Sequence, residues 1–399
     1  MKKIDDDHRA AAERTMGRLG GHAPSIEELH DGEAASLTGG AAAFNHLPLQ
    51  DADIALGGAL IPFYRERLRH DGDDPHWAPL DFGHLRSELD VPILLVGGWY
   101  DYHRRYMWQD YQVARARPDA HTRLVIGPWY HTGLDRRVVN EETRRWFDDH
   151  ADRKEVRPES SASVRLYLTP DRGWSETPQW PPKGSTPTTL YLGPGQRITS
   201  SEPGNAGADT YLYDPGDPTP SVGIASFGGP GTSTPVDNRA LEARADVLTY
   251  TAEPFVDAVT LVGAVRARLF VNSTEPTADF FVRITDVHPD GSSFNVVDGI
   301  TRIPHTDELP GPEPVEVEVD LGPVAHRMDP GHALRIQVSS GAHPMYSRNP
   351  GGTEPPATTM RLIPATQTVH LGGNHASKVL LDLYAGEFRT NSNAKASQE

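Results

Sequence analysis

Two short, mostly apolar runs in the first half of the chain predict buried parallel strands. The runs are Pro92–Val96 and Thr122–Ile126, and each stops at a glycine. The segments that follow them, 103–115 and 141–150, have helical patterns, and Asn140 is the expected N-cap of the second helix. The order of strand, loop and helix, found twice in succession, predicts part of an α/β sheet.

After about residue 160 the pattern changes to short β-type runs separated by Pro, Gly, Asp and Ser. These runs are Val164–Leu168, Thr188–Leu192, Leu261–Val271, Phe280–Val287, Val315–Val319 and Leu334–Ser339. Between them, segment 193–235 is rich in loop-forming residues. Short strands with turn-rich connections are typical of an all-β sandwich, which we therefore expect here.

The first 88 residues are polar and predict helices. Segments 7–19 and 25–32 end in glycine stops, and 61–70 is a further short helix. We therefore divide the chain into four parts. These are a helical cap region at 1–88, an α/β region at 89–157, a β sandwich at 158–390 and a disordered tail at 391–399.

Each of the two predicted strands ends in a motif that carries a potentially reactive side chain. Gly97-Gly98-Trp99-Tyr100-Asp101 follows the first strand, and Gly127-Pro128-Trp129-Tyr130-His131 follows the second. Open α/β sheets place their chemistry at the carboxyl ends of strands. An acid followed later by a histidine is also the chain order of the last two triad members in α/β-hydrolases. The sequence thus predicts Asp101 as the orienting acid and His131 as the general base.

Both residues, and the aromatic residues beside them, also have structural interpretations. Asp101 can cap a helix that opens at His103, and such a cap does not exclude catalysis. An isolated histidine is usually just packed or exposed, but the motif around His131 favours the base. Four aromatic residues either line an apolar acyl pocket or fill the top of the sheet: Trp99, Tyr100, Trp129 and Tyr130.

The two motifs resemble those of the CocE/NonD acyl hydrolases, the family of cocaine esterase and the X-Pro dipeptidyl-peptidases. Three later segments resemble recurring parts of that family's C-terminal domain: Tyr211–Pro215, Asp246–Tyr250 and Asp286–Gly291, the last followed by Asp298–Ile300. The resemblance covers residues 45 to 385. It implies a partial α/β-hydrolase fold with a helical cap, followed by a C-terminal jelly-roll sandwich.

By the same resemblance, the chain is expected to be a serine hydrolase of the esterase or X-Pro dipeptidyl-peptidase type. Asp101 and His131 would be two members of a Ser-His-Asp triad that acts on small esters, amides or short peptides. No Gly-x-Ser-x-Gly motif occurs in the 399 residues. The resemblance places the serine in a preceding segment, together with a tyrosine of the oxyanion hole, so the chain alone is expected to lack the nucleophile.

Three explanations of the missing serine stay open. The chain is a truncated form of a longer enzyme, or half of a split hydrolase whose nucleophile is on a partner chain, or an inactive remnant whose jelly roll binds a ligand or partner. Two strands do not form a stable sheet, and their open edge would be apolar. This favours an incomplete or partnered chain, and the family resemblance is compatible with homo-oligomers. The sequence does not identify the substrate.

Composition narrows the choice of partners. The net charge is −17, from 38 basic and 55 acidic residues, which argues against binding to nucleic acid or anionic membranes. There is no cysteine, which excludes disulfides, thiolate metal sites and a cysteine nucleophile. No apolar run approaches the roughly 18 residues that span a bilayer, and Met1–Asp7 does not resemble a signal peptide. We therefore expect a cytoplasmic protein.

Three aspartates raise the question of a metal loop. Asp279, Asp286 and Asp290 lie close together in the sequence, but their spacing does not match the EF-hand calcium loop. Hairpin turns explain them better. We therefore expect neither a metal ion nor a cofactor.

Overall fold

The structure is a computed structural model that describes residues 43–70, 72, 74–117, 121–151, 163–204, 207–223, 235–303, 311, 313–388 and 390–391. The chain forms two compact units, one of residues 1–71 with 357–360 and one of residues 72–356 with 361–399. The helices predicted at 7–19 and 25–32 lie outside the described residues. So does the predicted tail at 391–399, except for Asn391, which ends a strand.

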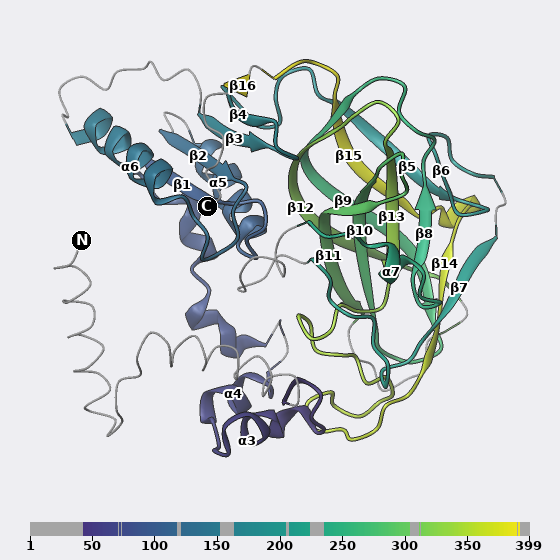
Figure 1. Ribbon diagram of the computed structural model, residues 1–399. Helices are drawn as coiled ribbons and strands as arrows, with labels where there is room; N and C mark the ends of the chain where they lie inside the picture. Colours follow the sequence, from purple (N-terminus) through teal and green to yellow (C-terminus); the bar gives the residue numbers. More distant parts are fainter. Residues whose placement is uncertain are drawn as a thin grey trace. The chain divides into compact units, whose positions relative to one another are not determined.

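The described part of the smaller unit is helical and is organised around one buried carboxylate. Its elements are η1 (Leu49–Asp51), α3 (Ala52–Gly57) and α4 (Pro62–Arg67), which confirms the helix predicted at 61–70 in a shorter form (Figure 1). Asp53 is 3% exposed. It accepts hydrogen bonds from Nε of Arg65 at 2.9 Å and from the backbone N–H of Ile61 at 2.8 Å. These bonds, led by that from Arg65, hold the pKa of Asp53 below its usual value.

The larger unit begins with a five-stranded mixed sheet in the order β1-β2-β3-β4-β16. β1, β2 and β3 are parallel, and β4 and β16 run antiparallel to their neighbours. The strands are β1 (Ile93–Gly98), β2 (Thr122–Gly127), β3 (Val164–Leu168), β4 (Gly173–Thr177) and β16 (Thr390–Asn391). The two predicted parallel strands are therefore confirmed. The strand at 164–168 was expected in the sandwich, but its hydrogen bonds go to β2 and β4.

Helices cover both faces of this sheet. Leu124 and Ile126 of β2 pack in one cluster with Trp108 of α5, whereas the intervening Val125 packs with Val138 of α6. This alternation is the period of two that a strand buried on both faces requires. These two helices are α5 (Arg104–Arg115) and α6 (Arg136–Ala151), and two short 3-10 helices, η2 (Pro75–Leu80) and η3 (Gly83–Ser87), precede β1 in the chain. Among all described helices, none has the length and apolar character needed to cross a membrane.

The helix predicted at 103–115 is confirmed as α5, but the predicted start of the next helix is wrong. α6 begins at Arg136, so Asn140 lies inside it. The capping side chain is Asp135, whose Oδ1 accepts the backbone N–H of Arg137 at 2.9 Å. An acidic cap at this position satisfies an otherwise unpaired N–H group of the first turn, which explains the earlier start.

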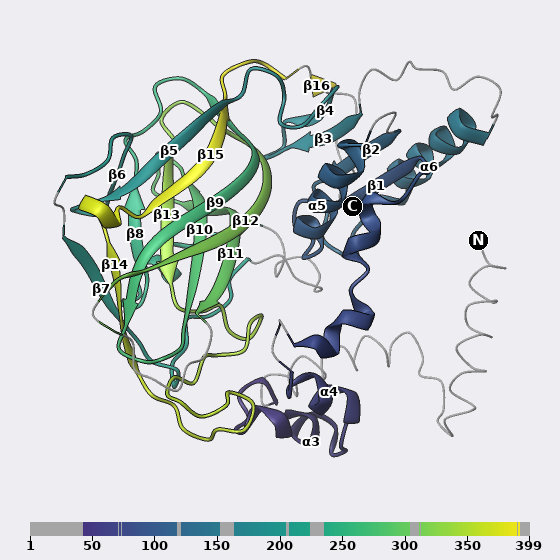
Figure 2. The ribbon, with the colours of Figure 1, turned by 180° about the vertical axis from the view of Figure 1, so that it is seen from behind.

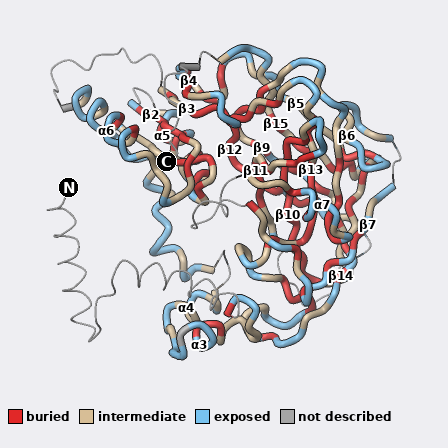
Figure 3. The backbone as a smooth tube through the Cα atoms, in the orientation of Figure 1, coloured by how far each residue is buried: buried red, intermediate tan, exposed pale blue. Residues whose placement is uncertain are grey.

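The rest of the larger unit is the C-terminal jelly-roll sandwich, which confirms the predicted β-type runs. Its central strand β9 pairs with β12, β14 and β15, which lie beside it in Figures 1 and 2. The buried residues follow the strands of this sandwich (Figure 3). The elements are β5 (Thr186–Gly193), β6 (Arg197–Thr199), β7 (Ala208–Tyr213), α7 (Arg239–Glu242), β8 (Leu248–Thr251), β9 (Val259–Ser273), β10 (Ala278–Val287), β11 (Ser293–Ile303), β12 (Val315–Met328), β13 (Ala333–Ser339), β14 (Ala365–His370), η4 (Gly373–His375) and β15 (Lys378–Tyr384).

The mixed sheet and the sandwich are joined at the end of β3. The backbone N–H of Thr169 donates to the carbonyl of Ala325 in β12 at 3.1 Å, and the N–H of Arg327 donates to the carbonyl of Thr169 at 2.8 Å. Arg104 of α5 adds a third link, because its guanidinium donates to the carbonyl of Leu321 at 3.2 Å. These bonds fix the loops after β1 and β3 against β12.

Candidate active site

The structure brings Asp101 and His131 together at the carboxyl ends of β1 and β2. The two strands are parallel with Gly98 opposite Gly127, so both following loops leave the sheet at the same edge. Nδ1 of His131 lies 3.1 Å from Oδ2 of Asp101. The Asp101 side chain is 9% exposed and that of His131 is 30% exposed. A mostly buried carboxylate therefore holds one ring nitrogen of a histidine that is partly accessible.

The second carboxylate oxygen of Asp101 holds the loop in place. Oδ1 accepts the backbone N–H of His103 at 2.8 Å, which is an Asx-type turn immediately before α5. The turn and the contact with His131 use different oxygens, so the structural and the catalytic interpretations of Asp101 are compatible. The turn also fixes the orientation of the oxygen that faces His131.

Glycines allow the two loops to approach closely. A Cβ atom on Gly98 would lie 2.0 Å from the carbonyl oxygen of Trp129, and one on Gly127 would lie 2.4 Å from the Trp129 indole ring. The N–H of Tyr100 donates to the same Trp129 carbonyl at 3.0 Å. The loop that carries Asp101 thus packs directly against the loop that carries His131, with no room for a side chain at either strand end.

We expect Gly98→Ala to destabilise the protein by about 1–3 kcal/mol or more, because its methyl group would overlap a backbone oxygen that has little freedom to move. Urea unfolding measures the effect. The matched control is Gly204→Ala, where a Cβ atom meets nothing within 4 Å. That variant should stay within about 0.5 kcal/mol of the wild type. Equal stability of the two variants would contradict the close approach of the loops.

The four aromatic residues beside the pair do not share one environment. Trp99 is 4% exposed and donates from Nε1 to the carbonyl of Tyr167 at 2.7 Å. Trp129 is 7% exposed and packs on Trp174, with ring centroids 5.5 Å apart. Both indoles therefore fill the protein interior. Tyr100 lines a cavity, and the Tyr130 ring lies over Gly133. A substrate-binding role for the four residues stays a prediction.

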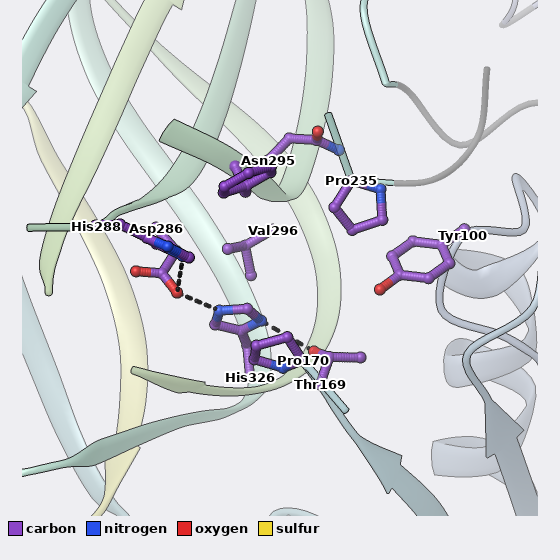
Figure 4. A pocket seen from close by; sticks show the side chains of 10 residues that line it. Tyr100, Thr169, Pro170, Pro235, Asp286, His288, Asn295, Val296 and His326 are labelled. Carbon is purple, nitrogen blue, oxygen red and sulfur yellow. Dashed lines mark hydrogen bonds and ion pairs between the residues drawn. The ribbon is translucent and has the colours of Figure 1, made fainter. Parts of the chain in front are cut away.

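The cavity next to Tyr100 has a volume of about 280 Å³ and lies between the mixed sheet and the sandwich. In Figure 4 the phenol of Tyr100 faces the cavity from one side, and His326 and Asp286 line the other. Burial, and secondarily the charge of Asp171, raises the pKa of Tyr100, so its hydroxyl stays a hydrogen-bond donor at neutral pH. Four apolar residues also line the cavity: Pro170, Pro235, Phe294 and Val296.

A second cavity, of about 220 Å³, adjoins the carboxylate of the pair. It is lined by Asp101 itself, by Arg104 and Arg105 of α5, and by residues of the sandwich that include Asp298 and Tyr346. Asp101 itself therefore lines a space large enough for small groups. Elements of the sheet and of the sandwich together form the surroundings of the Asp101–His131 pair.

The three aspartates that raised the question of a metal loop have separate partners. Asp279 accepts two hydrogen bonds from Arg302, at 2.6 and 2.8 Å. Asp290 accepts the N–H of Ser292 in a hairpin turn at 2.9 Å. Asp286 is bonded to histidines. Although burial alone would raise its pKa, the histidines lower it below its usual value. Turn formation explains Asp290, but the expectation is wrong for Asp279 and Asp286, which lie within β10.

Sequence reasoning missed Thr169 and His326, which line the first cavity. Nδ1 of His326 lies 3.0 Å from Oγ1 of Thr169, and its Nε2 lies 3.0 Å from Oδ2 of Asp286. These residues are far apart in the chain, and no motif surrounds Thr169 or His326. Only the pairing of β3 with β12 through Thr169 brings them together.

Two family models match the sequence. Residues 8–133 match the X-Pro dipeptidyl-peptidase (S15 family) model, and residues 156–380 match the X-Pro dipeptidyl-peptidase C-terminal non-catalytic domain. Cocaine esterase from Rhodococcus sp. (strain MB1 Bresler) is 32% identical over 88% of this chain and 66% of the esterase. A putative serine esterase from Mycobacterium bovis is 26% identical over 65% of this chain and 46% of its own length.

Solved structures share the fold. An aminopeptidase from a marine sediment archaeon, Thaumarchaeota archaeon, superimposes with a TM-score of 0.73 and 22% identity over 86% of this chain and 63% of its own length. An α-amino acid ester hydrolase has the same TM-score and 23% identity, over 86% of this chain and 64% of its own length. These likenesses confirm the α/β-hydrolase and β-sandwich architecture. The chain spans no more than 66% of any of these four proteins.

Proposed function

The chain belongs to the X-Pro dipeptidyl-peptidase (S15) family, and from this premise we propose that it forms the acid- and base-bearing part of a serine hydrolase of acyl esters or amides. One observation carries the proposal. The acid and the histidine that the family motifs single out lie 3.1 Å apart at neighbouring strand ends. Their chain order, with the acid before the histidine, is that of α/β-hydrolases.

In the proposed reaction His131 is the general base. Asp101 holds Nδ1, which leaves Nε2 as the nitrogen that takes the proton of a serine hydroxyl while the serine attacks the acyl carbonyl. The imidazolium formed is stabilised by Asp101 and returns the proton to the leaving group. Water then attacks the acyl-serine: His131 takes a proton from the water and returns it to the serine oxygen as the acid product leaves. In this proposal the serine comes from outside these 399 residues, because no Gly-x-Ser-x-Gly motif occurs in them.

The sheet offers an edge where a serine-bearing segment can join. Among the described residues, β1 pairs only with β2, so its other edge is open to a further strand. Apolar side chains lie exposed just before it, with Leu89 46% and Val91 55% exposed. We propose that strands carrying the nucleophile pair here, either from the same polypeptide or from a separate chain. The second case is a split hydrolase, and co-purification with a serine-bearing partner would distinguish it.

The proposed substrates are small esters, amides or short peptides. Tyr100 and Tyr130, in the loops after β1 and β2, would contact the acyl group, and the buried Trp99 and Trp129 would set the shape of the loops beneath them. Cocaine esterase and the putative serine esterase are named for ester substrates, which is compatible with this class.

The acid–base pair can be tested on the 399-residue chain itself. We expect a far-downfield proton resonance from the N–H between Asp101 and His131, which disappears in His131→Gln and changes in Asp101→Asn. The histidines near Asp286 give signals of their own. The assignment therefore requires that His332→Gln leaves this resonance in place. A downfield spectrum that changes neither in His131→Gln nor in Asp101→Asn would contradict the proposal.

An esterase assay separates the proposal from its non-catalytic rival, in which the jelly roll binds a ligand or partner. We expect no turnover of an activated ester by the 399 residues alone, and turnover when the serine-bearing segment is present. A protein that stays inert with that segment present and folded would favour the non-catalytic interpretation.

A further inference from the structure

A group of three histidines surrounds one buried carboxylate in the sandwich. Asp286, near the end of β10, is 1% exposed. His288 lies in the turn between β10 and β11, His326 lies in β12, and His332 lies in the turn between β12 and β13. The group is separate from the Asp101–His131 pair, and the proposed hydrolysis does not use it.

Two of the three histidines account for the hydrogen bonding of the carboxylate. Nδ1 of His332 lies 2.8 Å from Oδ1 of Asp286, and Nε2 of His326 lies 3.0 Å from Oδ2. Nε2 of His288 also faces Oδ2, but at 3.7 Å, which is too long for a hydrogen bond. Its ring lies against that of His332, with centroids 4.2 Å apart. A carboxylate satisfied by two N–H donors does not explain the third imidazole.

We propose that Asp286, His288 and His332 bind a divalent transition-metal ion of the zinc type. One ligand atom from each residue lies within 4.8 Å of the others. Atoms bonded to Zn²⁺ at about 2.0–2.1 Å are about 3.3 Å apart in a tetrahedral site. The contacts of Asp286 run to its two different oxygens, from Oδ1 to Nδ1 of His332 at 2.8 Å and from Oδ2 to Nε2 of His288 at 3.7 Å. To hold one ion, one of these oxygens would be the ligand, and the imidazole that faces the other oxygen would shift toward it.

The chemistry of the donors selects the metal. Two imidazole nitrogens and one carboxylate oxygen suit zinc, nickel or copper, whereas calcium and magnesium prefer an all-oxygen set. Three protein ligands leave a fourth position for water or a small ligand. Asp286 and His288 line the cavity of about 280 Å³ that Tyr100 faces from the other side (Figure 4). The fourth position would open toward this cavity.

His326 supports the proposed ligands without belonging to them. Its Nε2 contacts the carboxylate, and its Nδ1 is held by the hydroxyl of Thr169 at 3.0 Å (Figure 4). Ligating carboxylates in metal sites are usually held by such outer hydrogen bonds, which fix their orientation. Backbone hydrogen bonds between Thr169 and β12 hold the Thr169 hydroxyl in position beside His326.

The test is the titration of the untagged 399-residue chain with Zn²⁺ alone by isothermal calorimetry. We expect one zinc ion per chain, and affinity at least about tenfold weaker in His288→Ala and in His332→Ala. Co²⁺ bound in place of Zn²⁺ should give the visible spectrum of a nitrogen- and oxygen-ligated ion, and this spectrum should be lost in the same variants. His288 is 32% exposed in a turn, so its substitution should leave folding intact, which circular dichroism checks.

A second group of described residues, Glu66, His70 and His76, could also hold a metal ion, so His70→Ala tests whether zinc binds there instead. This variant should bind zinc as the wild type does. The proposal is overturned if the wild-type chain shows no saturable zinc binding, or if binding survives both His288→Ala and His332→Ala. Loss of zinc binding in His70→Ala would show that zinc binds in the smaller unit, and this result would also overturn the proposal.

Discussion

Replacing His131 with alanine, in a form of the protein that contains the nucleophilic serine, is expected to lower kcat for an activated ester by about 10³-fold or more. The reason is that Asp101 orients this imidazole through Nδ1, and in the proposed reaction its Nε2 carries the proton between the serine and the leaving group. Steady-state kinetics with a chromogenic ester measures the effect. KM should change far less than kcat, because the missing group acts in the transition state.

The control is His121→Ala, which removes an exposed imidazole just before β2 and should leave kcat unchanged. Added imidazole should restore part of the activity of His131→Ala if the cavity left by the side chain admits it. Full activity of His131→Ala would end the role assigned to this residue. A comparable loss in His121→Ala would show that the effect comes from folding rather than from proton transfer.

Asp298→Ala is expected to lower the free energy of unfolding by about 3–5 kcal/mol, because it would leave a buried cation without its counter-ion. Arg283 is 0% exposed in the middle of β10. Its guanidinium donates to Oδ2 of Asp298 at 3.2 Å and to Oδ1 of Asn238 at 2.6 Å. Burial lowers the pKa of Arg283, but the group stays charged at neutral pH and needs an anion beside it.

The exposed pair in β9 and β12 is the matched control. Glu318 contacts Arg268 at 3.3 Å, and both side chains are more than two fifths exposed. Glu318→Ala should therefore cost no more than about 1 kcal/mol. Urea unfolding of both variants gives the comparison. A loss below about 1 kcal/mol for Asp298→Ala would mean that Arg283 does not depend on this carboxylate.

The parts of the fold that sequence predicted correctly are those that local pattern determines. β1 and β2 are short apolar runs closed by glycine, and α5 follows an aspartate that forms an Asx turn immediately before it. The start of α6 was wrong because two side chains, Asp135 and Asn140, could each cap a helix there. Which of them does so depends on packing. The short run of β3 fits either sheet, and only its pairing with β2 decides between them.

In the candidate site, too, local sequence predicts some residues and not others. Asp101 and His131 were predictable because each follows its strand directly. By contrast, a motif does not reveal whether an adjacent indole faces a pocket or the core, and Trp99 and Trp129 face the core. The histidines around Asp286 were not predictable as a group. His326 and His332 lie 40 and 46 residues away in sequence, in β12 and in the turn before β13, and only the folded sandwich brings both to one carboxylate.

Arg104 limits how this architecture can be recombined. Its guanidinium donates to the carbonyl of Trp99 at 2.6 Å and to that of Leu321 at 3.2 Å, so one buried cation spans the turn before Asp101 and a strand of the sandwich. In a chimera with another β domain in place of the sandwich, the buried guanidinium would lose one hydrogen-bond acceptor, unless the new domain presented an acceptor at the same place. A domain exchange therefore has to keep both Arg104 and a carbonyl acceptor in the position of Leu321.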